Sequence, residues 1–76
     1  MSHSNNPIRR IASNQVITPT GHCMTLQVLE LRDGLLVDLY PLTHEMANTQ
    51  WFQGEIVLRK CDDGAVRAYY KGKPIT

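Results

Sequence analysis

The stretch from Met24 to Leu42 constrains the fold more than any other part of the sequence, because two apolar runs flank Arg32-Asp33-Gly34. Asp-Gly between runs rich in leucine and valine indicates a β-hairpin, since glycine adopts the positive φ of a tight turn without steric cost. The stretch therefore predicts two antiparallel strands joined by a short loop.

The apolar pattern selects between two registers for this hairpin. A two-residue loop sets Leu29 opposite Asp38. A three-residue loop, Arg32-Asp33-Gly34, sets Leu29 opposite Val37 instead. This second register gathers the apolar residues of both strands on one face. We therefore expect the three-residue loop.

The other face of the hairpin also carries apolar side chains, which lie beside Glu30 and Asp38. They are Leu26, Val28, Leu36 and Tyr40. A face exposed to water would be polar along its length, so part of this second face requires a cover. A sandwich, a small barrel or a dimer would supply one.

The residues before the hairpin predict further β-structure. Ile8–Thr18 indicates one strand with a bend, or two short strands, because Ser13-Asn14-Gln15 interrupts its apolar residues. Pro19-Thr20-Gly21 indicates a turn, since proline presets one φ and glycine allows the left-handed conformation. This segment therefore leads directly into the hairpin.

The residues after the hairpin predict a connector and a long strand. Pro41 ends the preceding strand or places it at an edge, because proline cannot donate to a β-ladder. Thr43–Asn48 can form one helical turn, capped by Thr43 and with Met46 inward, and serves as a connector. Trp51–Lys60 alternates as a strand does, and Gly54 indicates a bulge or a close backbone approach.

A second hairpin follows at Asp62-Asp63-Gly64. A three-residue loop at this position sets Leu58 opposite Ala68 and Ile56 opposite Tyr70. The alternative two-residue loop would place two cations opposite each other. We therefore expect a three-residue loop here as well.

These segments together predict an all-β fold, either a small antiparallel sandwich or a partly open barrel of five to six short strands. Gly72-Lys73-Pro74 adds a last turn, with a β-bridge at Ile75. We expect residues 1–7 to be frayed or disordered and residues 8–76 to form a single β domain. A domain of 76 residues buries only about 60% of the surface of its unfolded chain, so a partner subunit would stabilise it.

The charge balance argues against a general nucleic-acid-binding surface. Eight Lys and Arg residues against seven Asp and Glu leave a formal net charge of +1, whereas nucleic-acid modules usually carry a basic stripe. The sequence has no run of about 18 apolar residues and no signal-peptide core, so we expect a cytoplasmic protein. In that compartment Cys23 and Cys61 are expected to be free thiols.

Candidate metal ligands are few and poorly spaced. His22-Cys23, His44 and Cys61 offer the imidazole and thiolate groups that zinc accepts. However, the sequence has no C-x-x-C or H-x-x-x-H pair, and adjacent residues on a strand point to opposite faces. We expect no metal site and no cofactor.

Candidate catalytic groups are equally sparse. His44-Glu45 with Asp38 could form an acid/base pair. The sequence contains no glycine-rich phosphate loop, Gly-x-Ser-x-Gly elbow or catalytic cysteine motif. Small domains also seldom enclose an enzyme-sized pocket. We expect no catalytic residues and no enzymatic activity.

Aromatic and basic residues occur together in the last third of the chain, at Trp51-Phe52 and at Tyr69-Tyr70. Because side chains alternate along a strand, one ring of each pair points inward, and we assign Phe52 and Tyr70 to the core. Trp51 and Tyr69 then point outward, with Arg67 and Lys71 beside the tyrosines. The candidate binding residues are Trp51, Tyr69, Arg67 and Lys71.

Two functions fit these outward residues. The first is a non-catalytic β-module that acts through protein–protein contacts or self-association as a homo-oligomer, because exposed aromatic residues are enriched at interfaces. The alternative is a small β-barrel that binds single-stranded nucleic acid, with bases stacked on aromatic rings beside a positive groove. We expect no membrane partner.

Three segments resemble the N-terminal β-subdomain of metal-dependent amidohydrolases: Asn14–Gly21, Leu26–Leu39 and Trp51–Leu58. In that family a strand with a V-I-T-P-x-G-like end leads into a hairpin turned by Asp-Gly. An aromatic-x-Gly-x-hydrophobic strand then enters the catalytic barrel. The resemblance covers about two thirds of the chain.

The chain departs from the amidohydrolase pattern at Arg59–Gly64. Relatives continue there into Pro-Gly and a His-x-His metal pair, whereas this chain turns back into another strand. No metal ligand is carried over. The resemblance implies a β-subdomain without the barrel, which would expose a face that its relatives cover and favour self-association or docking on another protein.

Overall fold

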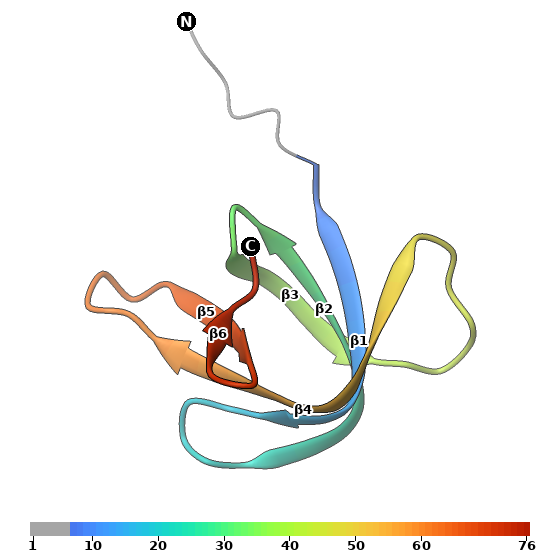
Figure 1. Ribbon diagram of the computed structural model, residues 1–76, viewed down its shortest axis with the longest axis horizontal. Coiled ribbons are helices and arrows are strands. Elements are labelled where there is room, and N and C mark those ends of the chain that lie inside the picture. The colour runs from blue at the N-terminus through green and yellow to red at the C-terminus, as the bar shows by residue number, and fades with distance from the viewer. Residues whose placement is uncertain (1–6) are drawn as a thin grey trace, which may run out of the picture.

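Six strands form one mixed sheet that curls into a partly closed ring, not a regular barrel, in the computed structural model of the chain (Figure 1). The strands are β1 (Arg9–Ile17), β2 (Cys23–Arg32), β3 (Leu35–Pro41), β4 (Thr49–Lys60), β5 (Val66–Tyr70) and β6 (Lys73–Pro74). Their order is β3-β2-β1-β4-β5-β6, and a bridge between Leu35 and Arg67 joins β3 to β5. The predicted all-β fold of five to six strands is confirmed, and of the two expected arrangements the partly open barrel is nearer to this ring. The expectation of a purely antiparallel arrangement fails at one strand pair, β1 and β4.

The structure describes residues 7–76, so most of the terminus predicted to be frayed, residues 1–6, lies outside the described residues. Pro7 and Ile8 precede β1 without regular structure. Within residues 7–76 no helix is long and apolar enough to cross a membrane.

The sheet is mixed because β1 and β4 run parallel, whereas the other strand pairs are antiparallel. Residues 42–48, which we call the connector, therefore lead from β3 to a strand beyond β2 and β1. The last residue of β3, Pro41, pairs with Gln27, which in turn pairs with Ser13 on β1. The first residue of β4, Thr49, pairs with Arg10 on β1. The end of β3 and the start of β4 therefore differ by only three residues in position along β1. For this reason the connector can be far shorter than the usual crossover of a dozen residues or more.

The predicted helical turn at Thr43–Asn48 is wrong, since the connector is an irregular segment with a turn at its end. Strands β3 and β4 lie three strand spacings apart, about 14 Å. Six helical residues would span only about 9 Å, so the connector has to be more extended. Asn48, with φ 58°, turns the chain into β4.

The register predicted for the first hairpin is also wrong. Its loop is Asp33-Gly34, and both residues have positive φ, 55° and 80°, as a type I′ turn requires. Leu31 pairs with Leu36, but the register shifts before Glu30 and leaves Val37 as a bulge. Val37 is 50% exposed rather than part of the core.

The bulge restores the apolar pairing that the two-residue loop alone would lose. Beyond Val37, Glu30 pairs with Asp38 and Leu29 pairs with Leu39. The expectation assumed a constant two-residue period along both strands, and one extra residue in β3 breaks that period.

The register predicted for the second hairpin is confirmed. Leu58 pairs with Ala68, and Ile56 pairs with Tyr70. The N–H of Cys61 donates to the carbonyl of Ala65 at 2.7 Å, which leaves Asp62-Asp63-Gly64 as the three-residue loop.

A sharp bend in β1 and β4 produces the curl of the ring. The pairing of β1 with β4 shifts between Ser13 and Gln15, and Gly54 takes φ 111°. The side chains of Ser13 and Asn14 hold this bend, because Ser13 Oγ donates to the carbonyl of Gly54 and Asn14 Oδ1 accepts from its N–H at 3.0 Å. The bend and the bulge predicted here are both confirmed.

The core fills the inside of the ring. Its buried members are Ile11, Val16, Leu29, Leu31, Ile56, Leu58, Ala68 and Ile75. Phe52 and Tyr70 pack against this cluster with their rings edge to face, 4.8 Å between centroids. Their predicted inward orientation is confirmed.

Candidate functional site

A row of four side chains crosses the outside of the ring. Tyr40 on β3 pairs with Val28 on β2, which pairs with Ala12 on β1, which in turn pairs with Trp51 on β4. Ala12 and Val28 are 2% and 0% exposed although neither belongs to the core cluster. The outer face of the first hairpin is therefore covered within this chain around Val28, whereas Leu26 on the same face stays exposed.

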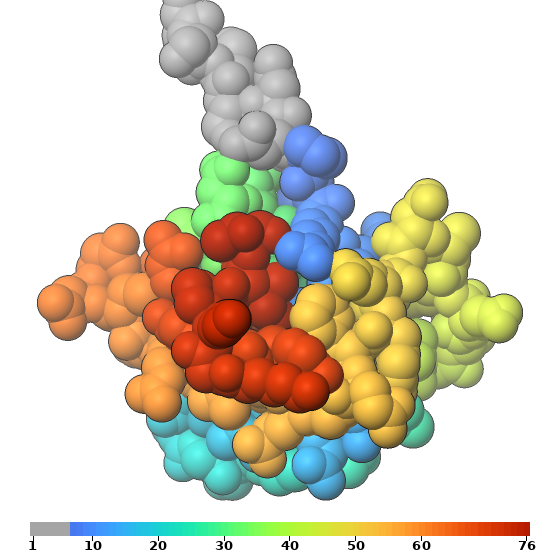
Figure 2. Space-filling model, viewed as in Figure 1, coloured from blue at the N-terminus to red at the C-terminus, as the bar shows by residue number. Residues whose placement is uncertain are grey.

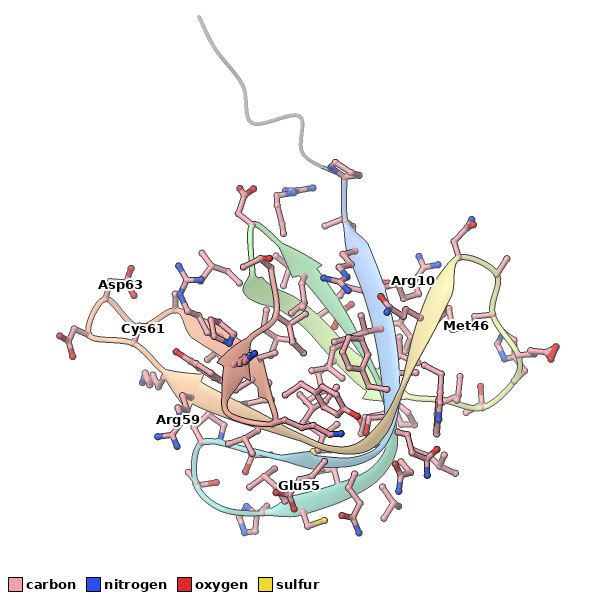
Figure 3. The ribbon with its side chains drawn as sticks, viewed as in Figure 1. Arg10, Met46, Glu55, Arg59, Cys61 and Asp63 are labelled. Carbon is pink, nitrogen blue, oxygen red and sulfur yellow. The ribbon has the colours of Figure 1, made fainter. Side chains whose placement is uncertain are left out.

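The connector supplies part of that cover. Leu42 and Met46 line one hollow together with Ala12 and Trp51, and the N–H of Leu42 donates to the carbonyl of Leu26 at 2.8 Å. Figure 3 shows Met46 on the side of the molecule where the connector meets the start of β4. Met46 was expected to point inward from a helical turn. It is half-buried, but on the outer face of the ring, and it is not among the residues that pack against the core.

A polar cluster next to this row ties the connector to the sheet. Arg10 Nε lies 3.2 Å from Glu30 Oε2, which also accepts a 2.5 Å hydrogen bond from the hydroxyl of Tyr40. A second nitrogen of Arg10 reaches the carbonyl of Ala47 in the connector at 3.4 Å. The guanidinium therefore links β1, β2 and the connector.

Hydrogen bonding sets the ionisation of this cluster. The bond from Tyr40, and then the guanidinium of Arg10, lower the pKa of Glu30 below its ordinary value, although burial acts in the opposite direction. The same bond, with burial, raises the pKa of Tyr40. At neutral pH the cluster contains a carboxylate, a guanidinium and a protonated phenol.

A hollow of about 160 Å³ opens between the connector and the outer face of β1 and β4. It is lined by Ala12, Leu42, Glu45, Met46, Thr49 and Trp51. Trp51 is 47% exposed. Sites for metabolites and cofactors usually measure about 300–1,000 Å³, whereas an apolar cavity of about 150 Å³ holds one benzene-sized group. The hollow therefore has the size of a single side chain.

The four candidate binding residues do not form one site. Tyr69 on β5 pairs with Val57 on β4, and Trp51 lies six residues before Val57 on the same strand. Arg67 sits where β3 and β5 join, and Lys71 lies in the turn before β6 with φ 53°. The structure thus separates Trp51 from the three residues of the β5 region.

The β5 region carries basic residues beside both of its tyrosines, and we refer to this part of the molecule, which includes both faces of β5, as the basic surface. It consists of Arg59, Lys60, Arg67, Tyr69 and Lys71. The guanidinium of Arg59 lies 5.8 Å from the centre of the Tyr69 ring, and Lys71 Nζ lies 5.4 Å from that of Tyr70. A shallow hollow of about 440 Å³ adjoins Arg59 and Lys60. Figure 3 places Arg59 on the opposite side of the molecule from Met46.

The candidate metal and acid/base residues stay apart. In the part of the chain that the structure describes, no three His, Cys, Asp or Glu side chains gather where they could hold a metal ion. His44 Nδ1 lies 3.0 Å from Thr43 Oγ1, and Asp38 accepts a hydrogen bond from the N–H of Leu39. No described contact joins Asp38 to His44 or Glu45.

The sequence indicated Trp51 but not the residues that surround it. Leu42, Met46 and Glu45 line the same hollow as Trp51 because the connector crosses the sheet, and no local pattern reveals such a crossing. One signal was available, namely the apolar outer face of the hairpin that required a cover. The sequence did not show whether this chain or a second one supplies it.

The fold and the hollow define a small all-β protein with a partly closed ring of strands and a side-chain-sized depression beside a half-exposed tryptophan. Comparison with protein-family models, with curated proteins and with solved structures gives no match. The resemblance to the amidohydrolase β-subdomain therefore rests on its sequence motifs alone.

Proposed function

We propose that this chain is a non-catalytic β-module that acts through protein–protein contacts or self-association at the surface around Trp51. We define the Trp51 surface as Leu26, Leu42, Met46 and Trp51. The observation that carries the proposal is the half-exposed indole of Trp51 at the edge of an apolar hollow. Tryptophan is among the residues most enriched at the energetic centres of interfaces.

Leu26 supports the same surface. Its side chain is 49% exposed and its backbone has φ 51°. Leucine in the left-handed region is strained by roughly 1–2 kcal/mol, and an exposed leucine gains little from burial in the monomer. A contact that covers Leu26 would add the free energy of burying its side chain, which offsets part of the strain.

The experiment is light scattering coupled to size-exclusion chromatography across a range of protein concentrations. We expect the wild type to self-associate and Trp51→Ser to shift the equilibrium toward monomer. Val37→Ser is the matched control, because Val37 is equally exposed, at 50%, but lies in the β3 bulge. A wild-type chain that stays monomeric at the highest concentration, or equal effects of the two substitutions, would argue against self-association at Trp51.

A second candidate function is binding of single-stranded nucleic acid at the basic surface. The packing of Arg59 over Tyr69 favours it, as does the presence of five of the eight basic residues between Arg59 and Lys73. Bases could stack on the ring while the cations contact phosphates. Salt-dependent oligonucleotide binding that is lost in Tyr69→Ala and Lys71→Ala, and kept in Trp51→Ser, would support this function. Binding that is insensitive to salt would contradict it.

A further inference from the structure

We propose that the hollow beside Trp51 binds one cationic side chain, lysine or arginine, of a partner polypeptide. The proposal rests on the protein-contact function and adds the chemistry of the contact. Glu45 would hold the charged end, and the apolar walls with the indole of Trp51 would hold the aliphatic stem. Figure 2 shows the connector, which carries Glu45, projecting from one side of the molecule.

The size of the hollow selects one side chain as its occupant. Its volume of about 160 Å³ is close to that of a cavity that holds one benzene-sized group. Lysine and arginine place their methylene groups against apolar surface while the charge stays near water. Ala12, Leu42 and Met46 provide such a surface.

The polar groups of the hollow select a cation rather than an anion. The two lining residues with side-chain N–H or O–H donors are both satisfied. Trp51 Nε1 donates to Gln53 Oε1 at 3.2 Å, and Thr49 Oγ1 donates to the carbonyl of Ala47 at 3.3 Å. What remains is the carboxylate of Glu45, which can only accept.

Glu45 is available for a partner. Among residues 7–76 its side chain takes part in no described hydrogen bond or ion pair, and it is the one charged group that lines the hollow. The carboxylate of Glu30, by contrast, is already bound by Arg10 and Tyr40. Arg10, the cation that touches the connector, is therefore neutralised by Glu30 and leaves Glu45 uncompensated.

Trp51 adds a second attraction for a cation. The face of an indole attracts ammonium and guanidinium groups more strongly than other aromatic rings do. A carboxylate and a tryptophan at one apolar hollow therefore favour a lysine or an arginine over an uncharged side chain of the same length.

The test uses the emission of Trp51, the single tryptophan of the chain. The probes are short blocked glycine peptides that differ in one central side chain: lysine, arginine, norleucine or glutamate. We expect saturable changes in emission, with lysine and arginine binding about fivefold to tenfold more tightly than norleucine at low salt, and glutamate most weakly.

Two variants separate the charge from the apolar contact. Glu45→Gln should lower the preference for lysine over norleucine to the smaller part that the indole of Trp51 supplies. Glu55→Gln should keep the full preference, because Glu55 is exposed on the same strand as Trp51 but outside the hollow. Figure 3 shows Glu55 on the lower part of β4, away from Met46.

Three outcomes would overturn the proposal: equal affinity for norleucine and lysine, tighter binding of the glutamate peptide, or no change in Trp51 emission with any peptide at millimolar concentration. These outcomes are distinct from failure of the protein-contact function. If Trp51→Ser still abolishes self-association while the peptides show no preference for a cation, the contact function stands and the cation site does not.

Discussion

The hydroxyl of Tyr40 on β3 donates a 2.5 Å hydrogen bond to the carboxylate of Glu30 on β2, one strand away on the outer face of the ring. Arg10 on β1 approaches the same carboxylate oxygen from the other side. These side chains thus link three neighbouring strands on the outer face of the ring, next to the connector.

This relationship predicts a loss of stability in acid. The folded-state pKa of Glu30 is lowered from 4.5, so its stabilising contribution is present above that value and is lost as the pH falls through the folded-state pKa. Tyr40→Phe removes the largest cause of the shift. We expect it to cost about 1 kcal/mol near pH 7 and less at acidic pH below the folded-state pKa. Urea titrations at several pH values measure the difference, and a constant difference across that range would contradict the assignment.

The raised pKa of Tyr40 predicts a second loss of stability, at high pH. Its protonated form is favoured in the folded state, so the contribution is present below 10 and is lost as the pH rises through the folded-state pKa. Absorbance titration of the phenols should show Tyr40 ionising at a higher pH than in the unfolded chain. Glu30→Gln should bring that titration back toward the ordinary value.

The bulge at Val37 predicts which residues of the first hairpin tolerate a charge. Val37→Lys should change the free energy of unfolding by no more than about 0.5 kcal/mol, because the side chain is half exposed at the edge of β3. Leu29→Ala, at a fully buried position, should cost about 2–5 kcal/mol. Chemical denaturation compares the two. A large cost for Val37→Lys would support the register in which Val37 faces Leu29.

The contrast between the two hairpins shows how far local patterns can predict this fold. Leu58 and Ala68 were placed opposite each other correctly because alternation is unbroken from the loop into both strands. Leu29 was given the wrong partner because one extra residue, Val37, resets the period and has no distinct sequence signature. The alternation of apolar and polar residues thus predicted where the strands lie and which face of a strand is apolar. It did not predict where the pairing between strands is irregular.

The parallel pairing of β1 with β4 could not be predicted from the sequence, for a different reason. Which strands become neighbours depends on contacts between distant segments, and local periodicity does not encode them. Ala12 and Trp51 are paired although 38 residues of chain separate them, and the hollow exists only because of that pairing. The outward orientation of Trp51 was predictable, whereas its neighbours Leu42 and Met46 were not.

The bend of the ring predicts an unusual sensitivity at Gly54. Its φ of 111° lies outside the region that residues with a Cβ adopt, although a Cβ would meet only ordinary contact with Tyr70 at 3.9 Å. Gly54→Ala should therefore cost about 1–3 kcal/mol through backbone strain rather than through a clash. Gly64→Asn is the control, because asparagine tolerates the left-handed conformation of a loop glycine. Thermal denaturation should show a clearly lower midpoint for Gly54→Ala alone.

The cover that the connector provides can be tested without touching the core. Met46→Ser shortens a side chain that lines the hollow beside Trp51, so more water should reach the indole and Trp51 emission should shift to the red. We expect a cost in stability of about 1–2 kcal/mol, because Met46 is only half-buried and the core inside the ring stays intact. His44→Ser, an exposed change two residues away in the connector, should leave the emission unchanged. If both variants shift the emission equally, the connector as a whole moves, and Met46 is not the residue that shields Trp51.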